Sequence, residues 1–151
     1  MLAREIMSRD VITVSPEEEV DKAARILLEN KISGLPVVDA NNHVVGIITE
    51  KDLIVRAGEL KVPFYITLFD SIIFLENPIR FNNDVKKYIA TQIKDAMTRK
   101  VFMVEEDTPI NEIVEIMQKR AVNRVPVVRN DKLVGIITRN DILKALVKSN
   151  G

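Results

Sequence analysis

The sequence of 151 residues predicts an α/β protein made of two tandem repeats related by a pseudo-twofold axis, with a helical insert between them. The first observation is that "VVGIITEKDL" at 44–53 returns as "LVGIITRNDI" at 133–142. The second is that "IMSRDVITVSPEEEV" aligns with "AMTRKVFMVEEDTPI", and "KISGLPVVD" with "AVNRVPVVR", at one common offset. Self-similarity over this length indicates a duplicated supersecondary unit.

The repeats define three parts of the chain. We assign residues 1–57 to repeat one, 58–92 to an apolar helical insert and 93–151 to repeat two. Each repeat has the predicted order β-α-β-β-α. A unit of this size cannot bury both faces of its own sheet, so we expect the two copies to pack on each other.

The first half of each repeat predicts a strand and a helix. Short extended runs at 11–14 and 101–104 lead the two copies. Apolar residues then follow the i, i+3, i+4, i+7 spacing of a helix that buries one face. They are Val20, Ala23, Ala24, Leu27 and Leu28 in repeat one, and Ile110, Ile113, Val114 and Met117 in repeat two. Thr108 followed by Pro109 predicts a capped helix start.

The second half of each repeat predicts a hairpin and another helix. The β-branched runs "GLPVVD" and "HVVGIIT" flank Asn41-Asn42, a typical turn pair. A helix should follow over 50–57, and again over 139–147.

The insert contains the apolar stretch "VPFYITLFDSIIFLENP" at 62–78. We expect a helix that packs on the module or in a homodimer contact. The alternative is a docking patch for another protein or a membrane surface, because large exposed apolar patches usually mark interfaces. The run is too short for a membrane span.

Composition excludes several function classes. Repeat one holds seven basic and ten acidic residues, and repeat two holds eleven and eight, so the copies attract each other and no broad basic face for nucleic acid is expected. Cysteine is absent and His43, in the predicted turn, is the single histidine, so we predict no metal site. We find no nucleophile with a base and no glycine-rich phosphate loop, and we predict that the chain is not an enzyme. The charged first residues do not resemble a signal peptide, so we expect a cytoplasmic protein.

Each repeat carries Thr-x-x-Asp where its last strand meets its last helix. The residues are Thr49 and Asp52 in repeat one, and Thr138 and Asp141 in repeat two. The local interpretation is a capping box, in which Thr caps the helix and the acid suits the helix dipole.

The ordered motifs of both copies resemble the CBS domain, paired as in a Bateman module. The resemblance rests on "IMS" and "AMT", on "GLPVV" and "RVPVV", and on Gly-Ile-Ile-Thr-x-x-Asp, and it leaves out 58–92. It implies a regulatory sensor of AMP, ADP, ATP or S-adenosylmethionine, with no required cofactor, in a homodimeric disk of four repeats. It also implies that the motif Asp receives the ribose hydroxyls and the Thr assists, which suits a carboxylate facing a vicinal diol.

The resemblance assigns the remaining ligand contacts by position. The base-binding positions are Ile12, Ile32 and Gly34 in repeat one, and Phe102, Val122 and Arg124 in repeat two. Since each cleft of the family mixes the copies, Asp141 and Thr138 should face Ile12, Ile32 and Gly34, while Asp52 and Thr49 should face Phe102 and Val122.

The copies differ most where Gly34 matches Arg124. Arginine offers planar bidentate donors to a phosphate, and glycine allows close approach of a base. The Asp141 cleft, with both residues nearby, is therefore the predicted nucleotide site, and the Asp52 cleft is expected to be weaker or empty. The alternative for Arg124 is a surface charge paired with an acid.

Two other function classes remain open. One is a ligand-free dimerisation or adaptor module acting on an unidentified protein partner, and the less favoured one is a nucleic-acid binder. The Asp present in both copies favours the sensor, because a purely capping position accepts Ser, Asn or Glu as well.

Overall fold

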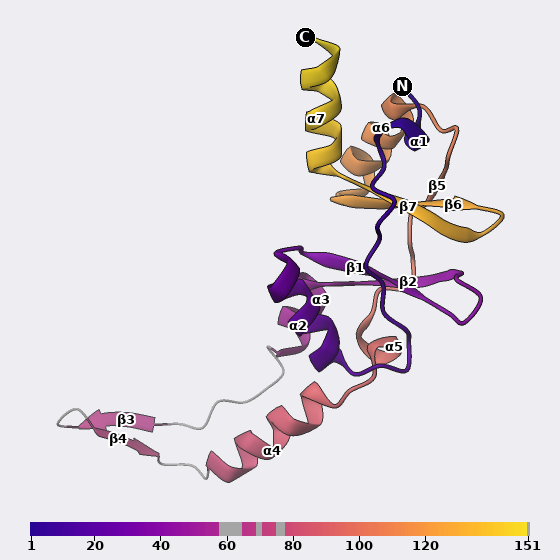
Figure 1. Cartoon of the computed structure of the whole chain (residues 1–151). Helices are drawn as coiled ribbons and strands as arrows, with labels where there is room; N and C mark the ends of the chain where they lie inside the picture. Colours follow the sequence, from indigo (N-terminus) through magenta and orange to yellow (C-terminus); the bar gives the residue numbers. More distant parts are fainter. Residues whose placement is uncertain (58–64, 69–70, 75–77, 151) are drawn as a thin grey trace.

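The structure, a computed structural model, describes residues 1–57, 65–68, 71–74 and 78–150 (Figure 1). Repeat one contains α1 (Ala3–Ile6), α2 (Val20–Asn30), β1 (Gly34–Val38), β2 (Val44–Thr49) and α3 (Glu50–Ala57). The middle of the chain contains β3 (Tyr65–Leu68), β4 (Ser71–Phe74) and α4 (Pro78–Ile89). Repeat two contains α5 (Ile93–Ala96), β5 (Val104–Glu105), α6 (Ile110–Arg120), β6 (Arg124–Arg129), β7 (Lys132–Thr138) and α7 (Arg139–Ser149). The mixed α/β architecture of two repeats is as predicted.

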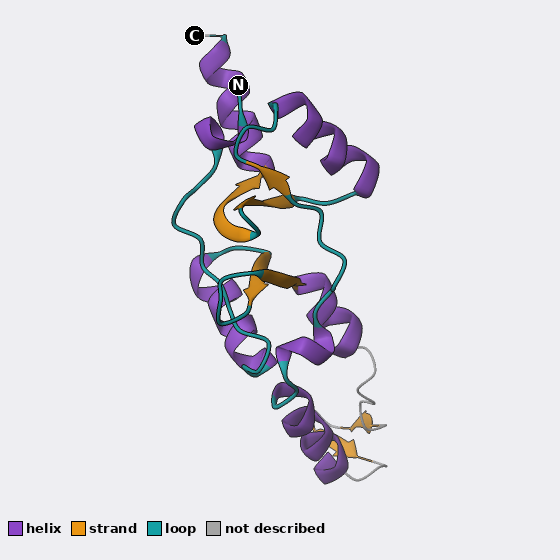
Figure 2. Ribbon diagram, turned by 90° about the vertical axis from the view of Figure 1, so that its right-hand side faces the viewer, coloured by secondary structure: helices purple, strands orange, loops and turns teal. Residues whose placement is uncertain are grey.

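The two repeats form equivalent antiparallel hairpins. Strand β1 pairs with β2 from Gly34 opposite Thr49, and β6 pairs with β7 from Arg124 opposite Thr138. Each pairing has an irregularity two residues after its proline, between Val37 and Val38 and between Val127 and Val128. The two small sheets lie in the middle of the module with helices at both ends (Figure 2).

The segments that lead the repeats are exchanged between them. Ser8 exchanges backbone hydrogen bonds of 2.9 and 3.0 Å with Ile136 of repeat two. In the same way Thr98 exchanges two bonds of 2.9 Å with Ile47 of repeat one. The matched exchange relates the halves by the predicted pseudo-twofold symmetry, and it makes each half depend on residues from both repeats.

The hydrophobic core of each repeat includes residues from the segment that leads the other repeat. Repeat two buries Ala3 and Met7 together with its own strands, and repeat one buries Ile93. The glycines of the two Gly-Ile-Ile-Thr motifs make room for the exchanged methionines. A Cβ on Gly46 would lie 2.5 Å from Sδ of Met97, and one on Gly135 would lie 2.5 Å from Sδ of Met7.

Gly46→Ala should therefore destabilise the protein. The new Cβ would also lie 3.1 Å from the backbone oxygen of Thr98, so the exchanged segment has to shift. We expect a loss of about 1–3 kcal/mol in the free energy of unfolding, the usual cost of overpacking a core. Urea denaturation measures it, and an unchanged midpoint would contradict the packing of Met97 on Gly46.

Two local predictions were wrong at the start of each repeat. In the run 11–14 only Val14 pairs, in parallel with Val37, because the chain there crosses from one sheet to the other. In repeat two the strand is limited to Val104 and Glu105. Thr108 does not cap α6, since its hydroxyl accepts a bond of 3.1 Å from the backbone of Glu105 and Pro109 is the N-cap residue.

The insert is not wholly helical. Its described apolar residues form the antiparallel pair β3–β4, with Tyr65 opposite Phe74, and helix α4 follows. Figure 1 shows this hairpin and α4 at the repeat-one end of the module. The hydroxyl of Tyr88 on α4 donates a bond of 2.5 Å to the backbone oxygen of Leu53 on α3. The rest of the stretch 62–78 lies outside the described residues, so its predicted role as a contact or docking patch stays a prediction.

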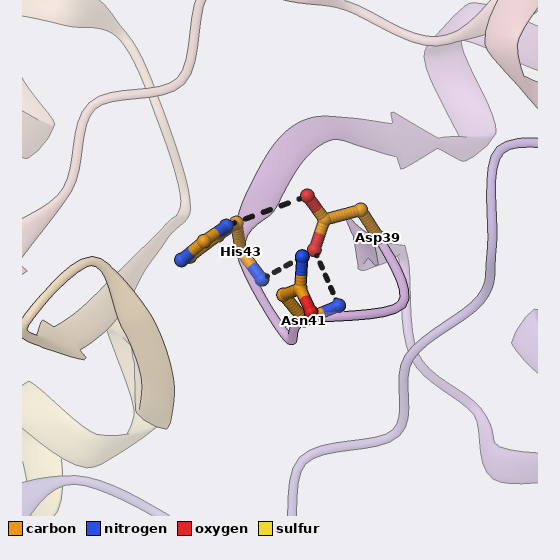
Figure 3. Close-up of polar contacts among 3 residues, drawn as sticks. All are labelled: Asp39, Asn41 and His43. Carbon is orange, nitrogen blue, oxygen red and sulfur yellow. Dashed lines mark hydrogen bonds and ion pairs between the residues drawn. The ribbon is translucent and has the colours of Figure 1, made fainter.

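The turn between β1 and β2 is built around Asp39 (Figure 3). Its Oδ1 accepts bonds of 2.9 Å from the backbone of Asn41 and of His43, and the bond from His43 is the main cause of its lowered pKa. The side chain of His43 is 42% exposed, and its Nδ1 lies 3.4 Å from Oδ2 of Asp39. Asn42 in turn donates to the backbone oxygen of Leu133 at 3.0 Å, which joins the two hairpins.

Candidate ligand-binding site

A cavity of about 930 Å³ lies between the two repeats. Six of the predicted site residues line it together: Ile12, Ile32, Gly34, Arg124, Thr138 and Asp141. The exchange of leading segments explains this, because the chain passes along the cavity on its way from Ser8 to Val14. A space of this size is typical of small-molecule sites.

The start of α7 presents a carboxylate to the cavity. Oδ2 of Asp141 accepts hydrogen bonds from the backbone nitrogen of Thr138 at 2.8 Å and from its hydroxyl at 3.1 Å. The Thr138 hydroxyl accepts from the backbone of Asp141 in return, which completes the predicted capping box. Within the described part of the chain, Oδ1 of Asp141 has no hydrogen-bond partner. One carboxylate thus caps the helix and keeps a free oxygen beside the cavity.

Arg124 reaches across from β6 to repeat one. Its guanidinium donates to the hydroxyl of Ser33, and a Cβ built on Gly34 would lie 2.5 Å from its Nη1. Burial lowers the pKa of Arg124, and the carboxylates of Glu50 and Asp52 oppose this. Because Gly34 has no side chain, the guanidinium of Arg124 has room to form part of the cavity wall.

Apolar side chains form another part of the wall. Ile12 and Ile32 are 39% and 36% exposed, although isoleucine is normally buried in a core. Both line the cavity, together with Leu28 of α2, which is 80% exposed. An aromatic base placed against them would remove this apolar surface from water.

Several polar residues of the cavity were not predicted from the sequence. Lys31 and Arg139 add cations, and Asp10 and Glu50 add carboxylates. Arg139 follows Thr138 in the Thr-x-x-Asp motif, so its position next to a predicted site residue could have identified it. Lys31 gave no such signal, because its position depends on the left-handed turn that ends α2.

The second predicted group is not in this cavity. Oδ2 of Asp52 accepts bonds from the backbone and hydroxyl of Thr49, at 2.9 and 3.0 Å. Oδ1 of Asp52 accepts a bond of 2.8 Å from the hydroxyl of Thr98. The ring of Phe102 lies under the guanidinium of Arg120, and Val122 packs against the core of repeat two.

The described residues contain neither a group suited to a metal ion nor a helix suited to crossing a membrane. No group of three His, Asp or Glu side chains there is placed to hold a metal ion. None of the helices in these same ranges combines the length and the apolar character that crossing a membrane requires.

Comparisons with known proteins agree with the fold of two repeats. The family model described as CBS domain matches residues 3–59 and 93–148. Protein MJ1426 of Methanocaldococcus jannaschii is 32% identical over 155 aligned residues, which cover 97% of this chain and 92% of that protein. The crystal structure of CBSX2 in complex with AMP has a TM-score of 0.76 at 25% identity, covering 99% of this chain and 98% of the other. The CBS domain pair of MJ0100 in complex with 5′-methylthioadenosine and S-adenosyl-L-methionine has a TM-score of 0.70 at 27% identity, with the same coverage.

Proposed function

The chain belongs to the CBS-domain family, and from this premise we propose that it is a non-catalytic regulatory module that binds an adenosine compound in the cavity beside Asp141. The observation that carries the proposal is the carboxylate of Asp141, whose Oδ1 has no hydrogen-bond partner among the described residues and which lines one cavity with an apolar wall and with Arg124. The AMP complex of CBSX2 and the S-adenosyl-L-methionine complex of MJ0100 support the ligand class.

Each part of the ligand has a chemically suited partner in the proposed mode. The ribose hydroxyls donate to Asp141, because an ionised carboxylate accepts two hydrogen bonds from a vicinal diol. The base lies against Ile12 and Ile32, with Gly34 allowing close approach. A phosphate group accepts from Arg124, whose guanidinium carries donors for bidentate contact.

A thermal-shift panel tests the proposal. Nucleotide-free protein is mixed with AMP, ADP, ATP, S-adenosylmethionine or 5′-methylthioadenosine, with GMP as the control for the base. A ligand at 100 times its Kd stabilises the folded state by about 2.7 kcal/mol and raises the Tm measurably. No shift with any adenosine compound at millimolar concentration would contradict the proposal and favour the ligand-free adaptor.

We also propose that the module is a homodimer that associates through α3 and α7. Leu143, Leu146 and Val147 on α7 are 58%, 53% and 75% exposed, and Val55 on α3 is 63% exposed. Exposed apolar patches usually mark an interface. Helix α3 also contributes Leu53 to the cavity wall, so a ligand that changes the position of α3 would change assembly.

Val147→Glu should weaken this dimer. A charge buried in the interface has no partner, and we expect the dimer Kd to rise by about 30-fold or more, as for an interface hot spot. Lys148→Glu, one position further along α7, is the matched control and should change it little. Light scattering after size exclusion measures the mass, and a monomeric parent protein would contradict the proposed homodimer.

A further inference from the structure

We propose that the hydroxyl of Thr98 occupies the carboxylate of Asp52, so that the chain binds one adenosine ligand, beside Asp141, and none beside Asp52. This inference rests on the proposed function. It gives Asp52 a structural role, although the repeat symmetry makes it the counterpart of Asp141.

Asp52 and Asp141 differ in the number of hydrogen-bond acceptor positions that they have left for a ligand. An ionised carboxylate has about four lone-pair positions. Asp52 uses three of them, for the backbone and hydroxyl of Thr49 and for the hydroxyl of Thr98 at 2.8 Å. Asp141 uses two, both on Oδ2. A vicinal diol needs two acceptor positions, so Asp141 has enough for a ribose and Asp52 does not.

Thr98 also differs from Ser8, its counterpart in the repeat. Both backbones pair with a Gly-Ile-Ile-Thr strand in the same way. Ser8 lines the open cavity, and in the part of the chain that the structure describes its hydroxyl makes no bond to Asp141. Threonine is restricted at χ1 by its methyl group, whereas serine rotates freely. Because of its methyl group, Thr98 holds its hydroxyl at Asp52, whereas the hydroxyl of Ser8 can rotate beside Asp141.

The residue predicted to contact the base beside Asp52 is Phe102, and it is covered by two cations. The Phe102 ring is covered by the guanidinium of Arg120 at 4.9 Å and by Nζ of Lys100 at 5.6 Å, both cation–π contacts. Its counterpart Ile12 is 39% exposed beside the open cavity. Lys100, Arg120 and Thr98 are all exposed, but the two cations can move off the ring, whereas the backbone of Thr98 is fixed by its pairing with Ile47. Thr98 is thus the group that decides whether a ligand binds beside Asp52.

Counting bound ligand tests the inference. Equilibrium dialysis with radiolabelled AMP at saturation should give one AMP per chain for the parent protein, and also for Asp52→Asn. Two AMP per chain, or loss of binding in Asp52→Asn, would overturn the inference and leave the proposed function standing. No binding by the parent protein would instead refute the proposed function, so the two failures are distinguishable.

Two substitutions test the role of Thr98 directly. Thr98→Ala frees Oδ1 of Asp52, and we expect saturation to rise to two AMP per chain. Ser8→Thr introduces the fixed hydroxyl beside Asp141 and should weaken AMP binding by about tenfold, the effect of one hydrogen bond. Thr91→Ala, which removes a hydroxyl bonded only to the backbone oxygen of Lys87, is the control and should keep one AMP. One AMP per chain in Thr98→Ala would overturn the assignment of Thr98.

Discussion

Asp141→Ala is expected to raise the Kd for AMP by about 100-fold or more, because it removes a charged acceptor of two hydrogen bonds that contribute about 1.5 kcal/mol or more each. Asp141 is the one acid of the cavity that also caps a helix, so the substitution costs stability too. We expect a loss of about 1 kcal/mol in the free energy of unfolding, as for other lost caps. Isothermal titration calorimetry and urea denaturation measure the two effects separately.

Two further variants separate the cap from the ligand contact. Asp141→Asn keeps an oxygen for the Thr138 bonds and turns an amide group toward the cavity, so AMP binding should weaken while stability stays near that of the parent protein. Asp52→Ala removes the same kind of cap from α3 outside the cavity, and it should change the Kd for AMP much less than Asp141→Ala does, because Asp52 acts on the site only through its charge near Arg124. Unchanged AMP affinity in Asp141→Ala would mean that the ribose binds elsewhere.

The sequence predicted the repeats well because they carry periodic patterns. The apolar spacing placed α2 and α6, and the two β-branched runs around Asn41-Asn42 placed β1 and β2. The exchange of residues 1–8 and 91–98 was not predictable, because a repeat shows which positions are equivalent and does not show which copy they contact. The apolar stretch 62–78 was ambiguous for a different reason, since short apolar runs rich in isoleucine suit a strand as well as a helix.

The candidate site shows the same limit. The motif positions of Asp141 and Ile12 could be named from the sequence, and they do line one cavity. The difference between Gly34 and Arg124 could also be read from the sequence, and it favoured the cleft at Asp141 over the one at Asp52. The bond from Thr98 to Asp52 could not, because it is a side-chain contact that no local pattern encodes.

Gly34→Val should nearly abolish binding while leaving the fold intact. The new Cβ would lie 2.5 Å from Nη1 and 2.7 Å from Cζ of Arg124, so the guanidinium has to leave Ser33 and its place in the cavity wall. None of the glycines among the described residues has a positive φ, so the strand itself tolerates a β-branched residue. We expect the Kd for AMP to rise by about 100-fold, from the lost charged hydrogen bonds and the filled base pocket.

Arg124→Ala distinguishes the two parts of this effect. It removes only the cation, so it should weaken binding of AMP and leave binding of adenosine, which has no phosphate, nearly unchanged. Gly34→Val should weaken both ligands, because the added side chain also occupies space beside Ile12 and Ile32. In the double variant the penalty of Gly34→Val for AMP should be smaller than in the parent protein, since the displaced guanidinium is no longer present. Equal penalties in both backgrounds would show that Gly34 and Arg124 act independently, and the proposed role of Gly34 in making room for Arg124 would be wrong.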